Sequence, residues 1–210
     1  MLRRPRRRRA PARGFTLIEI LVTIALILIG LVGMLGLQTR ASGVELESYQ
    51  RGQALTLVRD MAARVADSRS IASAYLANTL SSTDGSVFVG VTGSGTVDTG
   101  TCVNGASATE IATYQMCQWG KAIQGAAEGT SSGAMIGAHG CLIRNDTSAS
   151  GAVADVYIVV VWKGVTAGKD PLGMASGEAA TPASECASSV NFGTGLRRAV
   201  TMRVMVPTLG

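Results

Sequence analysis

The most pronounced pattern in the chain is an unbroken apolar run near its N-terminus. Residues 15–37 read FTLIEILVTIALILIGLVGMLGL, with Glu19 as the one charged side chain. At about 1.5 Å per residue, a helix of this length spans the roughly 30 Å hydrocarbon core of a bilayer. The run is longer than the apolar part of a secretory signal, and no A-x-A-like cleavage site follows it. The pattern therefore predicts a membrane-spanning helix over residues 15–37.

Beyond residue 37 the apolar positions change to an amphipathic pattern. They recur at helical spacing, with charged side chains mostly on other faces, and the stripe consists of Leu55, Val58, Met61, Ala62, Val65, Ala72, Tyr75 and Leu76. No proline interrupts residues 15–78, so we expect one continuous helix through both segments. Residues 38–80 would form its amphipathic second half and pack on a globular domain.

Residues 81–210 have the pattern of a loop-rich globular domain. The expected elements are a helix over 108–127 and strands over 87–89, 134–143, 155–163 and 196–206. A long Gly-, Ala- and Ser-rich loop fills 164–195. Because the helix comes first and the strands follow, the predicted fold class is α+β, with a long N-terminal helix packed on a small antiparallel β-sheet with long loops.

The positive charge of the chain is concentrated before the apolar run. The chain has 19 basic and 14 acidic residues, and seven arginines lie within residues 3–13. Such a cluster holds its side of a membrane span in the cytoplasm and places the C-terminal domain outside. Without residues 1–14, 12 basic residues face 14 acidic ones, so no overall basic character remains. We therefore expect no nucleic-acid partner.

Three residues at the junction need a separate explanation: Gly14 precedes the run, Phe15 opens it, and Glu19 lies inside it. The sequence Gly14-Phe15-Thr16-Leu17-Ile18-Glu19, between a basic leader and an apolar helix, resembles the processing motif of type IV prepilins and type II secretion pseudopilins. The resemblance implies that prepilin peptidase cuts between Gly14 and Phe15, removing residues 1–14 as a leader. It also implies N-methylation of the new Phe15 amine, and pairing of Glu19 with that amine on a neighbouring subunit. The alternative for Glu19 is a carboxylate that snorkels to the membrane interface.

Several short pieces of the tail refine this resemblance. They are Asp60–Val65, Tyr114 with Gln118-Trp119, Val161–Lys163 and Arg197–Val200. They look like the PilV class of minor pilins, which implies a pilin-like fold and a structural subunit that helps to start type IV pilus assembly at the filament tip. Its partners would be other minor pilins, the major pilin, prepilin peptidase and the inner-membrane assembly platform.

The same resemblance implies a location. The protein would cross the inner membrane once, with its C-terminal domain in the periplasm, and then enter the surface filament. The open alternatives are a type II secretion pseudopilin, a tip adhesin or DNA-uptake pilin, and an anchored domain that is never processed.

The four cysteines, Cys102, Cys117, Cys141 and Cys186, all follow the predicted span. An even number in an oxidising compartment predicts two disulfide bonds, with three possible pairings and free buried thiols as the alternative. A zinc site built from Cys117, His139 and Cys141 lacks the usual C-x-x-C spacing.

The sequence offers no pattern for catalysis. His139 is the only histidine, no G-x-S-x-G is present, and the Gly-rich stretch at 90–95 lacks the Lys-Ser/Thr of a phosphate loop. Asp146 and Asp155 flank a polar loop that could hold a cation, without EF-hand spacing. We expect no enzyme activity, no cofactor and no resident metal.

Overall fold

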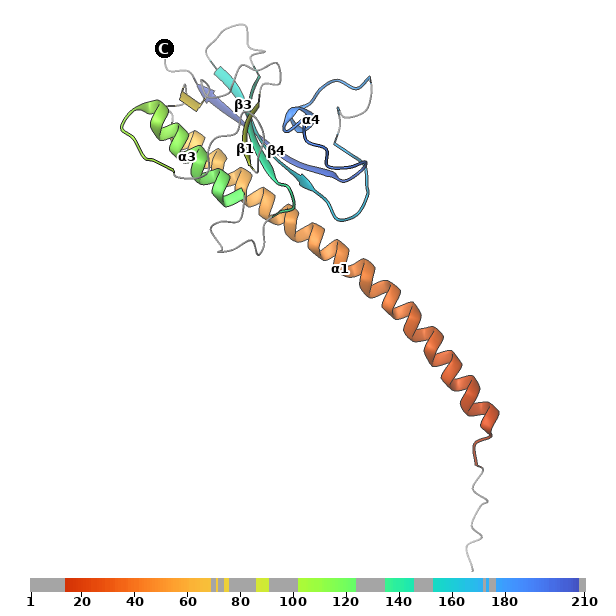
Figure 1. Ribbon diagram of the computed structural model, residues 1–210. Helices are drawn as coiled ribbons and strands as arrows, with labels where there is room; N and C mark the ends of the chain where they lie inside the picture. The colour runs from red at the N-terminus through yellow and green to blue at the C-terminus, as the bar shows by residue number, and fades with distance from the viewer. Residues whose placement is uncertain are drawn as a thin grey trace, which may run out of the picture. The chain divides into compact units, whose positions relative to one another are not determined.

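The computed structural model describes residues 14–68, 71, 74–75, 86–90, 102–123, 135–145, 153–171, 173 and 177–207. The chain divides into two compact units, Met1–Val44 and Glu45–Gly210. A single 51-residue helix, α1 (Leu17–Asp67), contributes to both units (Figure 1). The predicted continuous helix through the apolar and amphipathic segments is therefore confirmed over this range.

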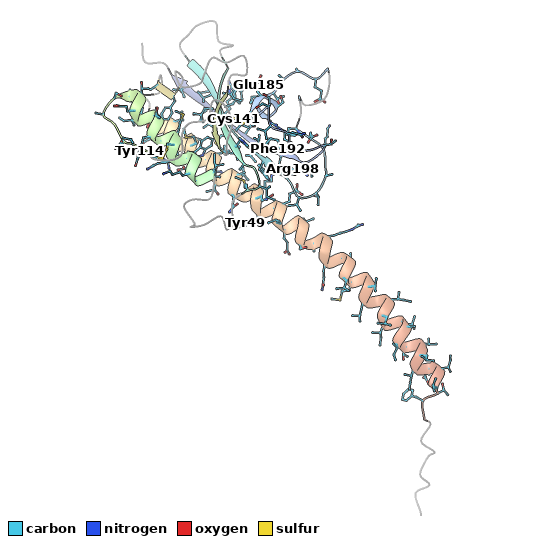
Figure 2. All side chains as sticks on the ribbon, viewed as in Figure 1. Tyr49, Tyr114, Cys141, Glu185, Phe192 and Arg198 are labelled. Carbon is cyan, nitrogen blue, oxygen red and sulfur yellow. A yellow bond between two sulfur atoms is a disulfide. The ribbon has the colours of Figure 1, made fainter. Side chains whose placement is uncertain are left out.

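In the first unit, α1 has no buried apolar face. Every residue from Gly14 to Gln38 is exposed, and the exposed fraction is 80% for Phe15 and 77% for Leu17. Figure 2 shows the side chains of this part of the helix projecting outward along its length. Among the described helices, α1 is long and apolar enough to cross a membrane. An apolar surface on all sides of a helix requires an apolar environment around it.

The end of α1 differs from the expectation of a helix as far as residue 78. The helix ends at Asp67, and the next backbone bonds run from Ser68 N to Arg64 O (3.0 Å) and from Ile71 N to Ser68 O (3.0 Å). The second bond closes a tighter, three-residue turn. Ser68 favours such an ending, because a serine hydroxyl competes for backbone groups.

The second unit contains a four-stranded antiparallel sheet in the order β1-β2-β3-β4. The strands are β1 (Ser86–Gly90), β2 (His139–Asn145), β3 (Val153–Lys163) and β4 (Arg197–Pro207). The helices are α3 (Ala108–Ile123) and the four-residue α4 (Pro182–Glu185). The predicted α+β pilin-like architecture is confirmed. The strand expected from residue 134 begins at His139, because Met135–Ala138 form a turn with Gly137 at φ 58°.

One face of the sheet packs against α1 and α3. The alternate β3 residues Val156, Ile158, Val160 and Trp162 join buried α1 residues such as Val58, Met61 and Val65 in one apolar core. Trp119 of α3 is fully buried there and donates from Nε1 to the carbonyl of Leu57 on α1 (2.9 Å). Ala72 and Leu76, the end of the predicted stripe, lie outside the described residues.

The opposite face of the sheet carries a second, smaller core. Val159 and Val161 of β3 pack there with Cys186, Ala187 and Phe192 from the long β3–β4 loop. The predicted loop over 164–195 therefore contains folded structure, including α4. Strand β3 carries apolar residues on both faces because each face of the sheet is buried under other parts of the unit.

Candidate functional site

The predicted processing junction lies directly before α1. Gly14, Phe15 and Thr16 are not helical, and the carbonyl of Thr16 accepts hydrogen bonds from the amides of Glu19 (3.1 Å) and Ile20 (3.3 Å). The Gly14–Phe15 bond is thus exposed and outside the helix, where a protease can reach it. A Cβ added to Gly14 would meet no atom within 4 Å, so the protein itself imposes no steric demand for glycine here.

Glu19 lies in the first turn of α1 and is exposed. A carboxylate is favourable there because unpaired amides make the helix N-terminus partly positive. Neither ion pair found among the described residues, Arg64–Asp60 and Arg198–Glu47, involves Glu19. The structure therefore places Gly14, Phe15 and Glu19 in one short exposed segment, and the role of each remains a prediction.

Two disulfide bonds join the four cysteines of the second unit. They pair Cys102 with Cys117 and Cys141 with Cys186, at sequence separations of 15 and 45 residues. The first ties the segment before α3 to that helix, and the second ties β2 to the residue after α4. Cys117 and Cys141 thus belong to different bridges, which rules against the zinc site that would use both thiolates.

The described part of the chain holds no metal-binding cluster, and the possible cation loop lies mostly outside it. No group of three His, Cys, Asp or Glu side chains gathers there to hold a metal ion. His139 is buried, and its Nδ1 lies 2.8 Å from the carbonyl oxygen of Gly137. Asp146, one of the two aspartates of the possible cation loop, falls outside the described residues.

Two of the tail pieces used for the finer resemblance, Asp60–Val65 and Tyr114 with Gln118-Trp119, meet where α1 contacts α3. Arg64 Nε bonds Asp60 (3.0 Å) on its own helix, and its NH1 reaches Gln118 Oε1 (3.3 Å) on α3. Gln118 in turn donates to the hydroxyl of Tyr114 (2.6 Å), a residue labelled on α3 in Figure 2. These side chains join the two helices, so the pieces have a structural role within the domain.

A polar contact that the sequence did not predict joins α1 to the start of β4. Arg198 donates from Nε to Glu47 and from NH2 to the carbonyl of Thr166 (2.7 Å), and the Thr166 hydroxyl donates to Glu47 (2.8 Å). The hydrogen bonds from Arg198 and then Thr166 lower the pKa of Glu47. No sequence pattern could have paired Glu47 with Arg198, because 151 positions separate them.

Arg197 lies on the opposite face of the sheet, beside the β3–β4 loop. The sequence did not predict that this residue is buried. Its exposed fraction is 2%, and its NH2 donates to the carbonyl oxygens of Ala183 (3.1 Å) and Cys186 near the end of α4. Its guanidinium lies 5.0 Å above the Phe192 ring. Burial lowers the pKa of Arg197, and the nearby Asp170 carboxylate acts in the opposite direction.

Comparison with known protein families finds a match at the N-terminus. Residues 9–35 match the family described as the prokaryotic N-terminal methylation motif. No curated protein and no solved structure matches the chain significantly. The matched residues include the end of the basic segment, the Gly14–Phe15 junction, Glu19 and most of the apolar run. The chain therefore carries an N-terminal methylation motif, the type IV prepilin-like signal, which supports a type IV pilin-like or pseudopilin protein.

Proposed function

We propose that this protein is a minor pilin of a type IV pilus, a structural subunit that helps to start filament assembly. The observation that carries the proposal is the combination of the methylation motif at residues 9–35 with a helix whose apolar side chains are all exposed through Leu37. Neither feature serves a soluble monomer. Together they are typical of a helix that is first anchored in a membrane and then packed among the helices of other subunits.

Burial energies support both stages. Covering one large aliphatic or aromatic side chain is worth about 1.5–3 kcal/mol. Side chains such as Ile24, Leu28 and Leu31 are 49–57% exposed in the single chain. A bilayer covers them before assembly, and neighbouring subunit helices replace the lipid in the filament.

Processing then creates the positively charged amine with which Glu19 is proposed to pair. Cleavage after Gly14 leaves a positively charged amine on Phe15, and N-methylation keeps that charge. In the apolar centre of a filament, a carboxylate and an amine leave water together, and removing one partner strands a buried charge at a cost of about 3–5 kcal/mol. Glu19 is proposed as the acceptor for the Phe15 amine of a neighbouring subunit, which sets the register of docking.

The assignment to an initiating subunit near the tip rests on the tail pieces that resemble the PilV class. Two disulfide bonds in the second unit suit a domain exposed to an oxidising periplasm. The proposed partners are other minor pilins, the major pilin, prepilin peptidase and the inner-membrane platform. The motif points to a structural subunit, and we propose no catalytic residue.

A deletion strain tests this proposal. Surface filaments are sheared from the parent, the deletion strain and a strain restored with tagged protein, and the major pilin in each sheared fraction is measured. A priming minor pilin predicts loss of surface pili on deletion, their return on restoration, and trace amounts of tagged protein in the filaments. Normal pili with failed secretion of exoproteins would instead identify a type II secretion pseudopilin.

A further inference from the structure

Two buried polar atoms lie without partners in the contact between α1 and the sheet. Gln50 Oε1 on α1 and Trp162 Nε1 on β3 have no hydrogen-bond partner among the described residues, and the two side chains are 4% and 2% exposed. One atom is an acceptor and the other is a donor. Buried groups of this kind are almost always paired, with protein or with an ordered water, because an unpaired group loses its solvation and gains nothing.

The positions of their neighbours place the two side chains in the same part of the contact between α1 and the sheet. Trp162 lies opposite Arg198 in the β3–β4 register, and Arg198 binds Glu47 on α1. Gln50 follows Glu47 by one helical turn, on the same buried side of α1. One turn further on, Ala54 belongs to the same apolar core as Trp162. Gln50 therefore lies between an α1 residue that binds Arg198, the register partner of Trp162, and one that belongs to the same apolar core as Trp162.

We infer that one buried water links Trp162 Nε1 to Gln50 Oε1, accepting from the indole and donating to the amide oxygen, and that this link and the Glu47–Arg198 ion pair form a polar latch that fixes the register of α1 on the sheet. A buried water needs polar partners to hold it, and this site offers one donor and one acceptor, with the Glu47–Arg198 pair adjacent. The polar latch is defined by Glu47, Gln50, Trp162 and Arg198.

The rest of this contact does not specify a register by itself. Ala54, Val58, Met61, Ala62 and Val65 present apolar groups that repeat about once a turn. Apolar burial is non-directional, so a slip of one turn, about 5.4 Å, would still bury much of the same surface. Hydrogen bonds need donor–acceptor distances near 3 Å, so the same slip would break both links of the polar latch. Single polar groups in apolar helix seams specify register in this way.

This inference goes beyond the proposed function and does not depend on it, because all four residues lie in the unit Glu45–Gly210. Its tests read out the folded domain, while the deletion experiment reads out filaments. Failure of one therefore leaves the other intact.

The first test observes the indole protons of the full chain in detergent micelles, labelled with ¹⁵N-tryptophan. The chain has two tryptophans, and Trp119, which donates to Leu57 O (2.9 Å), is the internal control. We expect Gln50→Leu to shift the Trp162 indole proton upfield, as a hydrogen bond is lost, and to leave the Trp119 signal in place. The matched variant Gln53→Leu, at a half-buried position on α1, should move neither signal. An unchanged Trp162 signal in Gln50→Leu would overturn the inference.

The second test is a double-mutant cycle with Gln50→Leu and Trp162→Phe, measured as hydrogen exchange of residues 45–58. Each single change leaves one buried group unpaired and should speed exchange about tenfold. The double variant removes both partners and should exchange no faster than the single variants. A roughly hundredfold effect, the product of two independent changes, would show that the residues are not partners. If Trp162→Phe fails to fold, the indole spectrum of Gln50→Leu decides alone.

Discussion

Two carboxylates on the same helix have opposite surroundings. Glu19 lies in the exposed first turn of α1, in a stretch of apolar side chains with no cover. Glu47 is held by Arg198 and Thr166, and its side chain is 25% exposed. The first carboxylate is in place for a partner from outside the chain, while the second has its partners within the domain. Their substitutions should therefore act on assembly and on stability, respectively.

Glu19→Ala should be processed normally and enter filaments poorly. The change leaves the Gly14–Phe15 junction intact and removes the proposed acceptor for the neighbouring amine, which then loses about 3–5 kcal/mol on burial. We expect the amount of this variant in sheared filaments to fall at least tenfold, as measured by immunoblot against total protein. Glu45→Ala, which changes an exposed carboxylate further along α1, is the matched control. Normal incorporation of Glu19→Ala would contradict the docking role.

Glu47→Gln should lower the stability of the second unit in a pH-dependent way. The pKa of Glu47 is lowered from 4.5 by hydrogen bonds from Arg198 and Thr166, so the folded state favours the ionised form. The stabilisation is therefore fully present above about pH 4.5 and is lost as the pH falls through the lower folded pKa. For a partly exposed pair it should amount to about 1 kcal/mol or less.

Urea unfolding followed by tryptophan fluorescence checks this prediction, because both tryptophans lie in the second unit. The wild-type chain and Glu47→Gln should differ at pH 7 and converge under acid. Glu45→Gln should match the wild type throughout. An equal loss in both variants would argue against a specific role of the Glu47–Arg198 pair.

At the scale of elements, the long β3–β4 loop is a folded layer on the sheet. The Cys141–Cys186 bridge fastens it to β2, and the buried Arg197 guanidinium binds carbonyl oxygens around α4. Gly195 completes the turn into β4 with φ 70°, and its backbone N–H donates a hydrogen bond to Asp170 Oδ2 (3.0 Å). The stability of the loop therefore depends on a disulfide bond and on the hydrogen bonds that the buried Arg197 guanidinium donates to carbonyl oxygens around α4.

Removing either disulfide should destabilise the second unit, and removing Cys141–Cys186 should do so more. In the chain-entropy account, closing loops of 15 and 45 residues contributes about 3 and about 4 kcal/mol, because the longer loop restricts the unfolded chain more. The paired variants Cys102→Ser/Cys117→Ser and Cys141→Ser/Cys186→Ser are compared by urea unfolding of the full chain in detergent. The reverse order would show that native contacts, rather than loop closure, dominate the effect.

At the scale of the molecule, the two units differ in how much of their apolar surface is buried. The unit Glu45–Gly210 buries two apolar cores, one on each face of its sheet, while α1 up to Val44 buries no apolar side chain. A soluble protein does not tolerate a continuous apolar surface of this size. The first unit therefore needs either a membrane or other subunits, and the second folds around its own cores.

Co-expression with prepilin peptidase should remove residues 1–14 and leave a methylated Phe15, which intact-mass spectrometry measures directly. Gly14→Leu should remain uncut, because the protease is expected to need a small residue before the cleaved bond. The space around Gly14 accommodates a side chain, so the block would not reflect misfolding. Ala12→Leu, two positions upstream, is the matched control and should be cut. An uncut wild-type chain would identify an anchored domain that is never processed.

Local sequence patterns predicted the helices and strands whose formation depends on residues close to one another in the sequence. The apolar run, the amphipathic stripe through Val65, the α3 helix and strand β4 all follow from periodicity. One local signal was missed: Ser107 and Glu110 form a capping box at the start of α3, with Ser107 N to Glu110 Oε2 at 3.0 Å. Its S-x-x-E spacing is readable in the sequence.

The amino-acid sequence alone determined the class of the N-terminal segment and the α+β order of elements, because hydrophobic period and the Gly14–Glu19 motif are properties of adjacent residues. Tertiary structure alone decided the two cysteine pairings, the second core under the β3–β4 loop and the Glu47–Arg198 contact. Each of these joins positions that only the folded sheet brings together. Pairing between distant residues depends on chain topology, which periodicity does not encode.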